Sequence, residues 1–328
     1  MKRRQNGLQG ILAAMGFLVL ILDSALALKG AKDGMELCIK TVIPSLFPFF
    51  VLSSVLTGSL AQQCPRPVRM AAKSLGIPNS AASILIPAFL GGYPVGAKSA
   101  KELWKQGQIT KNEAQWLLSF CSNAGPSFLF GMAAGFFPDT KAAWLLWGIH
   151  ILSGVLTAAV ISRPPVRDGD HVPVGAAQAH PVIFTAARAM MMVCCWVVLF
   201  RIVITFLDLW FFRRLPDWLR VLLTGLLELT NGCCELAAIG NEELRFVLCA
   251  CMLSFGGICV FFQTAAVTEG LSLKGYAMGK LMQTLFSLLL SLAVVSDFRI
   301  IYLTATAILP VILRKIQNHY SNLRTLPV

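Results

Sequence analysis

Charged side chains are scarce in this sequence. Only 13% of its 328 residues are Asp, Glu, Lys or Arg, whereas 56% are hydrophobic, and the mean hydropathy is +0.69. A chain with so little polar surface does not suit a soluble globular fold. Because apolar segments cross a bilayer most simply as helices of about 20 residues, the composition predicts an all-α polytopic membrane protein.

Acidic residues are the rarer of the two charge types. The chain has 16 Asp and Glu residues against 28 Lys and Arg residues, which gives a formal net charge of +12. In a soluble domain this excess would suggest a nucleic-acid partner. In a membrane protein it follows from the basic bias of cytoplasmic loops. We therefore expect a lipid bilayer, and no nucleic acid, among the partners.

Histidine is also scarce, and no catalytic signature accompanies the four histidines. The ten cysteines lie nearly all in apolar runs, without the spacing to histidine that a metal site needs. They are typical of small buried hydrophobic residues in a reducing or lipidic setting. We therefore expect no metal, no cofactor and no enzymatic activity.

The N-terminus combines a basic start with a long apolar run. Residues 8–28 are apolar over a length that spans a bilayer. A signal peptide cleaved near residues 25–27 is one interpretation. Asp23 and the length of the run fit a signal peptide poorly and favour a retained helix. We expect an N-terminal membrane helix within residues 1–34.

Glycine and proline interrupt the apolar segment at residues 80–97. The pieces are too short to cross a membrane singly, and broken backbone in hydrocarbon leaves N–H and C=O groups unpaired at several kcal/mol each. Protein or a water-filled cavity must therefore cover this segment. The pattern favours a re-entrant helical hairpin over a full crossing. The interrupting residues are Pro87, Gly91, Gly92, Pro94 and Gly96.

A second interruption follows in the span that we expect at residues 114–137. Thr110 and Glu113 have the capping-box spacing of a helix start, and the sequence at residues 123–126 breaks the helix that follows. Another span is expected at residues 142–161. With a kinked span at residues 35–60, the first half consists of a span, a broken hairpin, an interrupted span and a further span.

The second half repeats this order. Its interrupted segments lie at residues 219–239 and 246–267, and its complete spans lie at residues 185–212, 276–295 and 300–313. We therefore divide the chain into an N-terminal helix, two repeats joined by a polar linker, and a C-terminal helix with a basic tail. The five parts cover residues 1–34, 35–162, 163–183, 184–297 and 298–328.

The basic residues orient the two halves. If the chain crosses the membrane eight times and each half holds one hairpin, the basic residues on the side of the N-terminus outnumber those on the other side by roughly two to one. This is the distribution that the positive-inside rule requires. Lys280 is counted among these cytoplasmic charges. Both termini are then cytoplasmic, and the two hairpins enter from opposite faces. This plan is an inverted repeat, in which broken helices meet near the membrane midplane to bind a solute.

The first hairpin is a candidate binding element. Gly91 and Gly92 allow tight turns and close backbone approach beside Tyr93, and half-helix N-termini offer N–H donors to a carboxylate. Helix packing through small residues is the alternative, but the clustering of the glycines favours binding. Three polar side chains flank the next interruption and suit either solute binding or hydrogen bonding between helices: Ser122, Asn123 and Ser127.

The second half supplies the counterpart cluster of Glu228, Thr230 and Asn231. A carboxylate inside the membrane is costly and indicates function, so Glu228 is a candidate for binding a proton or a sodium ion. Arg201 lies in the middle of a span, where its partner is either Glu228, in a structural ion pair, or an anionic solute. If the halves meet at one site, Asn123 and Asn231 approach each other.

Three segments of the chain resemble a known family. They are GGYPVGAKSAKEL at residues 91–103, SFCSNAGPSFLFG at residues 119–131 and LLELTNGCCELA at residues 226–237. These segments, in this order, resemble the YlbJ-type sporulation integral membrane proteins, within the nucleoside-recognition or Gate domain group. That group is similar in plan to concentrative nucleoside transporters, whose two hairpins and two unwound helices hold the solute.

The resemblance implies a role in endospore formation. It suggests that the chain moves dipicolinic acid across the membrane around the forespore. Sodium ions and protons are the candidate coupling ions, because Glu228 is a candidate for binding either. A homo-oligomer is expected by analogy with related transporters. Two alternatives stay open: a carrier for nucleosides or another small solute, and a membrane protein that serves spore envelope assembly without transport.

Overall fold

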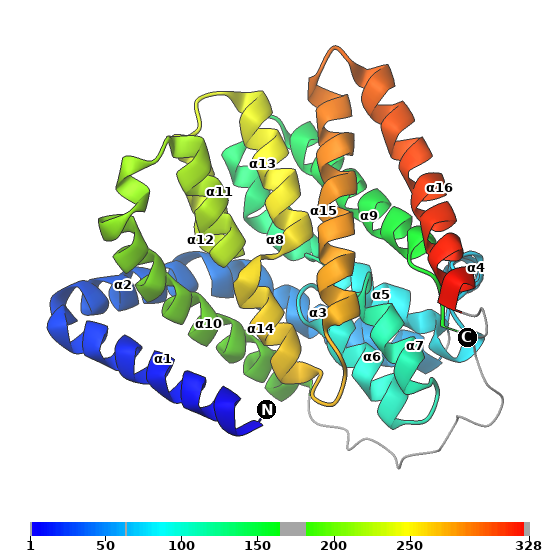
Figure 1. Ribbon diagram of the computed structural model, residues 1–328, viewed down its shortest axis with the longest axis horizontal. Helices are drawn as coiled ribbons and strands as arrows, with labels where there is room; N and C mark the ends of the chain where they lie inside the picture. Colours follow the sequence, from blue (N-terminus) through cyan, green and yellow to red (C-terminus); the bar gives the residue numbers. More distant parts are fainter. Residues whose placement is uncertain (1, 63, 165–181, 325–328) are drawn as a thin grey trace.

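All regular elements of the described chain are helices (Figure 1). The computed structural model describes residues 2–62, 64–164 and 182–324. This result confirms the all-α membrane architecture, in which helices satisfy the backbone within each segment. Within the described ranges, five helical segments are long and apolar enough to cross a membrane: Ser24–Leu52, Thr140–Val160, Val182–Trp210, Glu242–Val267 and Lys274–Val295.

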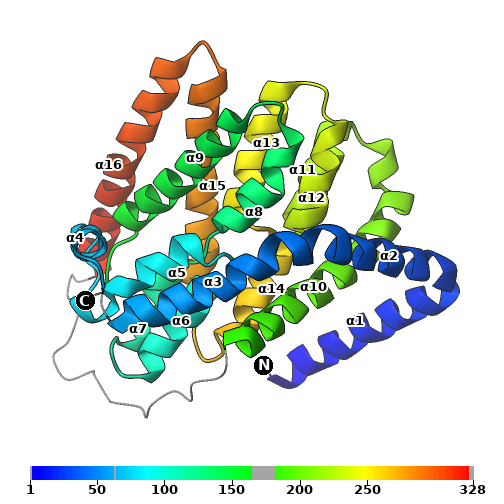
Figure 2. The same cartoon turned by 180° about the vertical axis from the view of Figure 1, so that it is seen from behind.

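The prediction of one helix over residues 8–28 is wrong. The structure has α1 at Lys2–Leu22 and α2 at Ser24–Leu37. Asp23 separates them because its side chain accepts a hydrogen bond from the backbone N–H of Leu26 at 3.0 Å and caps α2. Figures 1 and 2 show α1 at the periphery of the molecule, apart from the helices that form its core.

A long helix leads from α2 into the first half. It passes through a π-helical turn at Cys38–Val42 into α3 at Ile43–Gln62. Two glycines four residues apart bring α2 against α10, which spans Val182–Trp210. A Cβ atom on Gly30 would lie 2.9 Å from Ile202 Cα, and one on Gly34 would lie 2.9 Å from Val198 Cα. This is the packing mode of small residues between membrane helices.

The first interrupted segment is broken where glycine and proline predict. After α4 at Arg66–Ser74, a 3-10 turn at Asn79–Ile84 leads into α5 at Leu85–Leu90. The chain then turns, and α6 follows at Val95–Lys105. The re-entrant course of this hairpin through the membrane stays a prediction.

The segment at residues 114–137 is not one continuous span. The capping box of Thr110 and Glu113 is confirmed at the start of α7, which ends early at Leu118. The chain then runs without regular helix to Pro126, where α8 begins. Gly125, before Pro126, has extended backbone at φ −80° and ψ 162°. The remaining elements of the first half are α8 at Pro126–Gly131, a 3-10 turn at Ala133–Phe136 and α9 at Thr140–Val160.

The second half contains two further breaks. Glu228 separates α11 at Asp217–Leu227 from α12 at Leu229–Glu235. Gly256, with φ at +83°, separates α13 at Glu242–Phe255 from α14 at Gly257–Val267, because this left-handed backbone suits glycine. Short 3-10 turns lie at Phe212–Arg214 and Leu236–Ala238, and the last two helices are α15 at Lys274–Val295 and α16 at Arg299–Arg324.

The division into two inverted repeats stays a prediction. Residues 165–181 of the predicted linker and residues 325–328 of the predicted tail lie outside the described ranges. In the described residues, helix breaks fall within the predicted interrupted segments at residues 80–97, 114–137, 219–239 and 246–267.

Glycines set the backbone contacts around the break after α7. A Cβ atom on Gly96 of α6 would collide with the carbonyl oxygen of Cys121, and one on Gly279 of α15 would collide with the carbonyl oxygen of Ser119. Two helices from different halves therefore lie directly on this irregular stretch. Their contact covers the backbone that the helix break exposes.

Candidate functional site

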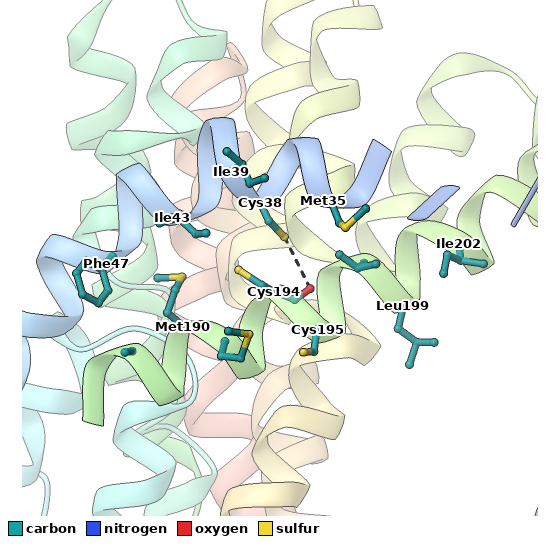
Figure 3. Close-up of a pocket in the computed structure, with 13 residues that line it drawn as sticks. Met35, Cys38, Ile39, Ile43, Phe47, Met190, Cys194, Cys195, Leu199 and Ile202 are labelled. Carbon is teal, nitrogen blue, oxygen red and sulfur yellow. Dashed lines mark hydrogen bonds between the residues drawn. The ribbon is translucent and has the colours of Figure 1, made fainter. Parts of the chain in front are cut away.

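One cavity is an apolar groove at the surface. It has a volume of about 700 Å³ and lies between the α2–α3 helix and α10 (Figure 3). Its wall includes exposed apolar side chains such as Ile39 and Met191, which are both 67% exposed. The hydrogen bond drawn there runs from Cys38 Sγ to the Cys194 carbonyl at 3.7 Å. Such a wall suits lipid chains better than a polar solute.

A much smaller cavity lies where the interrupted segments of both halves meet. We call it the inner cavity, and its volume is about 40 Å³. This volume accommodates one water-sized group, since a water molecule occupies about 30 Å³ in the liquid. Five sequence-predicted site residues line it: Gly92, Tyr93, Ser127, Glu228 and Thr230. The other lining residues are Leu46, Phe50, Ala124, Gly125, Phe128, Val193, Leu229, Val260 and Gln263.

Close backbone contact forms the first-half wall of the inner cavity. Gly92 has φ at +73°, and a Cβ atom on it would lie 3.4 Å from the backbone nitrogen of Gly125. The predicted tight turn is therefore confirmed at Gly92. Gly91 differs, because it ends α5 with φ at −80°, and a Cβ atom there would lie 2.7 Å from the Pro87 carbonyl oxygen. Gly91 serves packing and lies outside the lining.

Glu228 forms the second-half wall together with Thr230. Its carboxylate accepts hydrogen bonds from the backbone N–H of Thr230 at 3.1 Å and of Asn231 at 2.7 Å. The Asn231 side-chain amide donates a third bond at 2.7 Å. Glu228 is only 2% exposed. The carboxylate is thus anchored as the cap of α12 while it faces the inner cavity.

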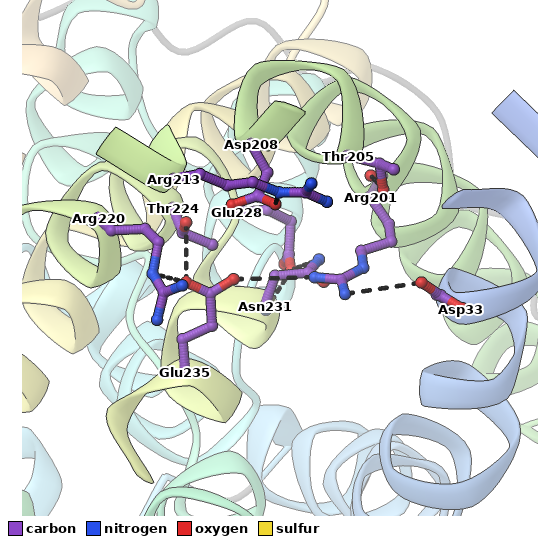
Figure 4. A network of polar contacts seen from close by, with 10 residues as sticks. All are labelled: Asp33, Arg201, Thr205, Asp208, Arg213, Arg220, Thr224, Glu228, Asn231 and Glu235. Carbon is purple, nitrogen blue, oxygen red and sulfur yellow. Dashed lines mark hydrogen bonds and ion pairs between the residues drawn. The ribbon is translucent and has the colours of Figure 1, made fainter. Parts of the chain in front are cut away.

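The partner of Arg201 differs from the predicted one. Its guanidinium lies 3.8 Å from Asp33 and 3.9 Å from Glu235, and it donates a hydrogen bond to Asn231 Oδ1 at 3.3 Å (Figure 4). The structural ion pair is therefore present, but with these two carboxylates in place of Glu228. The reason is the α2–α10 packing, which brings Asp33 beside Arg201.

Arg201 belongs to a larger group of charges, which we call the charged network. Glu235 also lies 3.9 Å from Arg220 and accepts a hydrogen bond from Thr224 at 3.2 Å. The carboxylate of Asp217 lies 3.3 Å from Arg220. The charged network consists of Asp33, Arg201, Asp217, Arg220 and Glu235. Asn231 links it to Glu228, because Asn231 accepts a hydrogen bond from Arg201 and donates one to Glu228.

A third cavity, the vestibule, adjoins the inner cavity. It has a volume of about 320 Å³ and lies between α6, α10 and α14. Val193 and Gln263 line both cavities. Its charged lining residues are all basic, namely Lys98, Lys101 and Arg188. Clefts lined by one sign of charge concentrate ligands of the opposite sign, so the vestibule favours anions.

Asn123 and Asn231 do not meet as expected. Asn123 donates to the carbonyls of Ala88 at 3.1 Å and Phe120 at 2.8 Å, and it accepts from Gln283 at 2.9 Å. Asn231 is held by Glu228 and Arg201 instead. Both asparagines, like Ser122, are buried but lie outside the lining of the inner cavity. The helix breaks near Asn123 and Asn231 meet through other residues, which line the inner cavity. The two asparagines each hold the backbone of their own break.

A buried polar group lies on α15 where the sequence predicts a cytoplasmic charge. The prediction for Lys280 is wrong, because its side chain is 2% exposed within the helix bundle. Its Nζ atom donates to Gln283 Oε1 at 2.8 Å, and Gln283 donates to Asn123. A signal was present in the sequence, because Lys280, Gln283, Ser287 and Ser291 recur every three or four residues along one face of the helix.

Among known proteins, no family model and no solved structure matches the chain. A curated relative does match: the sporulation integral membrane protein YlbJ of Bacillus subtilis (strain 168). It is 26% identical over 313 aligned residues, which cover 79% of this chain and 75% of the relative. Together with the membrane-spanning helices, this similarity supports the assignment of the chain to the YlbJ type of sporulation integral membrane proteins.

Proposed function

We propose that this chain is a carrier that moves a small anionic solute across a membrane during endospore formation. The observation that carries the proposal is that two cavities of different character lie side by side and share part of their walls. A basic vestibule shares Val193 and Gln263 with an inner cavity that both interrupted regions form. Broken helices that line a cavity inside a membrane protein are the usual setting of a transport site.

The vestibule supplies the anion site in this proposal. Its volume of about 320 Å³ falls in the range of small-molecule sites. Lys98 forms a 3.6 Å ion pair with Glu102, but both side chains are about half exposed, so the pair is weak. The vestibule cations are therefore accessible to a dianion. Dipicolinic acid, which the family resemblance implies, has two carboxylates on a small aromatic ring and fits this size and charge.

The inner cavity supplies a coupling-ion site. It is sized for one ion, and its polar lining residues include Glu228, Ser127, Thr230 and Gln263. These polar residues, set in a mostly apolar wall, suit a proton or a sodium ion. A cation beside Glu228 also attracts an anion in the adjoining vestibule, so the two solutes favour each other.

The charged network closes the other side of the path. Arg188 of the vestibule and Arg201 of the charged network lie on the same helix, about 20 Å apart at 1.5 Å per residue. Val193, which lines both cavities, lies between them on that helix. We propose that opening and closing of the charged network alternates with opening of the vestibule, which gives each side of the membrane access in turn.

Four further expectations complete the proposal. The carrier acts in the membrane around the forespore, and both termini lie in the cytoplasm of the cell that contains it. The chain is a carrier and not an enzyme. It assembles with further copies of itself, as related transporters do.

Uptake into liposomes tests the proposed function. The purified chain is reconstituted, and uptake of labelled dipicolinate is compared with that of uridine while the sodium and proton gradients are varied. We expect saturable dipicolinate uptake that needs one of the two gradients. A variant with Lys98, Lys101 and Arg188 all changed to Gln should lose apparent affinity. Folded protein that moves uridine and ignores dipicolinate would contradict the proposal.

A further inference from the structure

Lys280 is a buried lysine in the second turn of α15. Its Nζ atom donates hydrogen bonds to the Tyr93 hydroxyl at 3.1 Å and to Gln283 Oε1 at 2.8 Å. The centres of the Tyr93 and Tyr276 rings lie 4.9 Å and 6.0 Å from Nζ. Hydroxyl, amide and ring faces all accept a positive charge favourably. The site is therefore built to hold an ammonium group.

This ammonium group lacks a balancing carboxylate among the described residues. Their ion pairs all involve other cations. The titratable groups that face Lys280 are Tyr93, Tyr276, the Cys121 thiol after α7 and the His150 imidazole on α9. None of them is negative at neutral pH. Because an unbalanced charge inside a membrane protein is costly, the charged form of Lys280 needs a further negative partner.

Lys280 is connected to the inner cavity and to both interrupted regions. Tyr93 lines the inner cavity, and its hydroxyl donates to the Leu253 carbonyl of α13 at 3.1 Å. Gln283 carries the contact to Asn123, which holds the break after α7. A change of charge on Lys280 therefore acts on the residues that shape the inner cavity.

We propose that Lys280 is a proton-binding residue of the transport cycle, charged while the anionic solute is bound and neutral while the carrier returns empty. The inference rests on the proposed function, because an anion in the path supplies the missing negative charge. Anion and proton then favour each other's binding, since coupling between two sites is reciprocal. The proton enters from the aqueous side that loads the solute, binds the lone pair of Nζ, and leaves to the opposite side when the anion is released.

Two substitutions separate the charged and neutral states of this residue. Lys280→Arg keeps a positive charge that is not released, and Lys280→Gln is permanently neutral. Lys274→Gln, at the exposed start of α15, is the matched control. Each protein is reconstituted in liposomes, and two processes are measured: exchange of external labelled dipicolinate for internal unlabelled dipicolinate, and net uptake driven by a pH gradient.

Exchange needs no empty return step, whereas net uptake does. We therefore expect Lys280→Arg to keep exchange but to lose net uptake by at least about tenfold, a typical size for coupling between sites. Lys280→Gln should lose both processes, and Lys274→Gln should lose neither. Normal pH-driven net uptake by Lys280→Arg would overturn the inference. A purely structural role of Lys280 would not separate exchange from net uptake.

Proton uptake on binding gives a second measurement that does not depend on the Arg variant. Calorimetry of dipicolinate binding in buffers of different ionisation enthalpy should show about one proton taken up per solute by the wild type and none by Lys280→Gln. Binding without proton uptake, or unchanged proton uptake in Lys280→Gln, overturns the inference and leaves the proposed function intact. A wild type that neither exchanges nor takes up dipicolinate refutes the proposed function, and the inference with it.

Discussion

Glu228 illustrates how far single residues could be predicted. The sequence indicates its importance, because a carboxylate in an apolar run is costly. Its geometry could not be predicted, since its three hydrogen bonds depend on the local start of α12. The partner of Arg201 is less predictable still. Asp33 lies far away in sequence, and only the packing of α2 against α10 brings it within 3.8 Å.

Substitution of Glu228 separates its cap role from its charge. Glu228→Gln keeps an acceptor oxygen for the N-terminus of α12, whereas Glu228→Ala removes it and should cost about 1–2 kcal/mol of the free energy of unfolding. If the carboxylate binds the coupling cation, both variants lose gradient-driven dipicolinate uptake. Thermal unfolding in detergent and liposome uptake measure the two effects.

The matched control is Glu243→Gln, because Glu243 is an exposed residue in the first turn of α13. It should change neither quantity. Wild-type uptake by Glu228→Gln, with the same cation dependence, would show that the charge of Glu228 has no part in coupling.

The environment of Glu113 predicts a contribution to folding stability that depends on pH. Burial raises the pKa of Glu113, but hydrogen bonds from Thr110 and Arg163 outweigh it and hold the pKa below its ordinary value of 4.5. The bond from Arg163 is 2.9 Å long. A carboxyl whose pKa is lower in the folded state stabilises the fold above its ordinary pKa and loses this contribution as the pH falls through the folded value.

Glu113→Gln should therefore lower the melting temperature at pH 7, by an amount that corresponds to about 1–2 kcal/mol. The gap to the wild type should shrink as the pH falls below 4.5. Glu102→Gln is the control, since its ion pair with Lys98 is half exposed. A gap that does not change with pH would contradict the assignment.

At the scale of elements, helix breaks were easier to predict than helix contacts. Glycine, proline and Glu228 mark the breaks, because each disfavours a continuous apolar helix at its position. The end of α1 was not predicted, because Asp23 served only as evidence against a signal peptide and not as the cap of a new helix. The roles of Gly30 and Gly34 on α2, and of the polar residues on one face of α15, can be assigned only when the neighbouring helices are known.

Gly279→Ala tests the contact between α15 and the break after α7. A Cβ atom on Gly279 would collide with the Ser119 carbonyl oxygen. The backbone must then shift, and we expect a loss of about 1–3 kcal/mol in the free energy of unfolding, as for other overpacked positions. Thermal unfolding in detergent measures this loss.

Gly148→Ala is the matched control on α9. Apart from its chain neighbours and the backbone of its own helix, no described atom lies within 4 Å of a Cβ atom placed there. Because alanine favours a helix interior over glycine, this variant should gain about 0.5–1 kcal/mol. Equal effects of the two substitutions would show that α15 does not rest on the break.

At the scale of the whole molecule, composition predicts that the chain lies in a lipid bilayer, and the family resemblance suggests which solute it transports. Neither predicts the route of the solute through the protein. The vestibule forms from α6, α10 and α14, which belong to both predicted repeats, and its position beside the inner cavity depends on their packing. The burial of Lys280 could not be predicted either, because a lysine near the start of a helix is equally typical of a solvated helix end.

The most direct test of the central claim is to block the junction between vestibule and inner cavity. Val193 lines both cavities and is 8% exposed, whereas Val203 on the same helix is 41% exposed. Dipicolinate uptake into liposomes is measured for Val193→Trp and for Val203→Trp, after thermal unfolding shows that both are folded. We predict that Val193→Trp abolishes uptake while Val203→Trp transports like the wild type. Wild-type uptake by folded Val193→Trp would contradict a path through these two cavities.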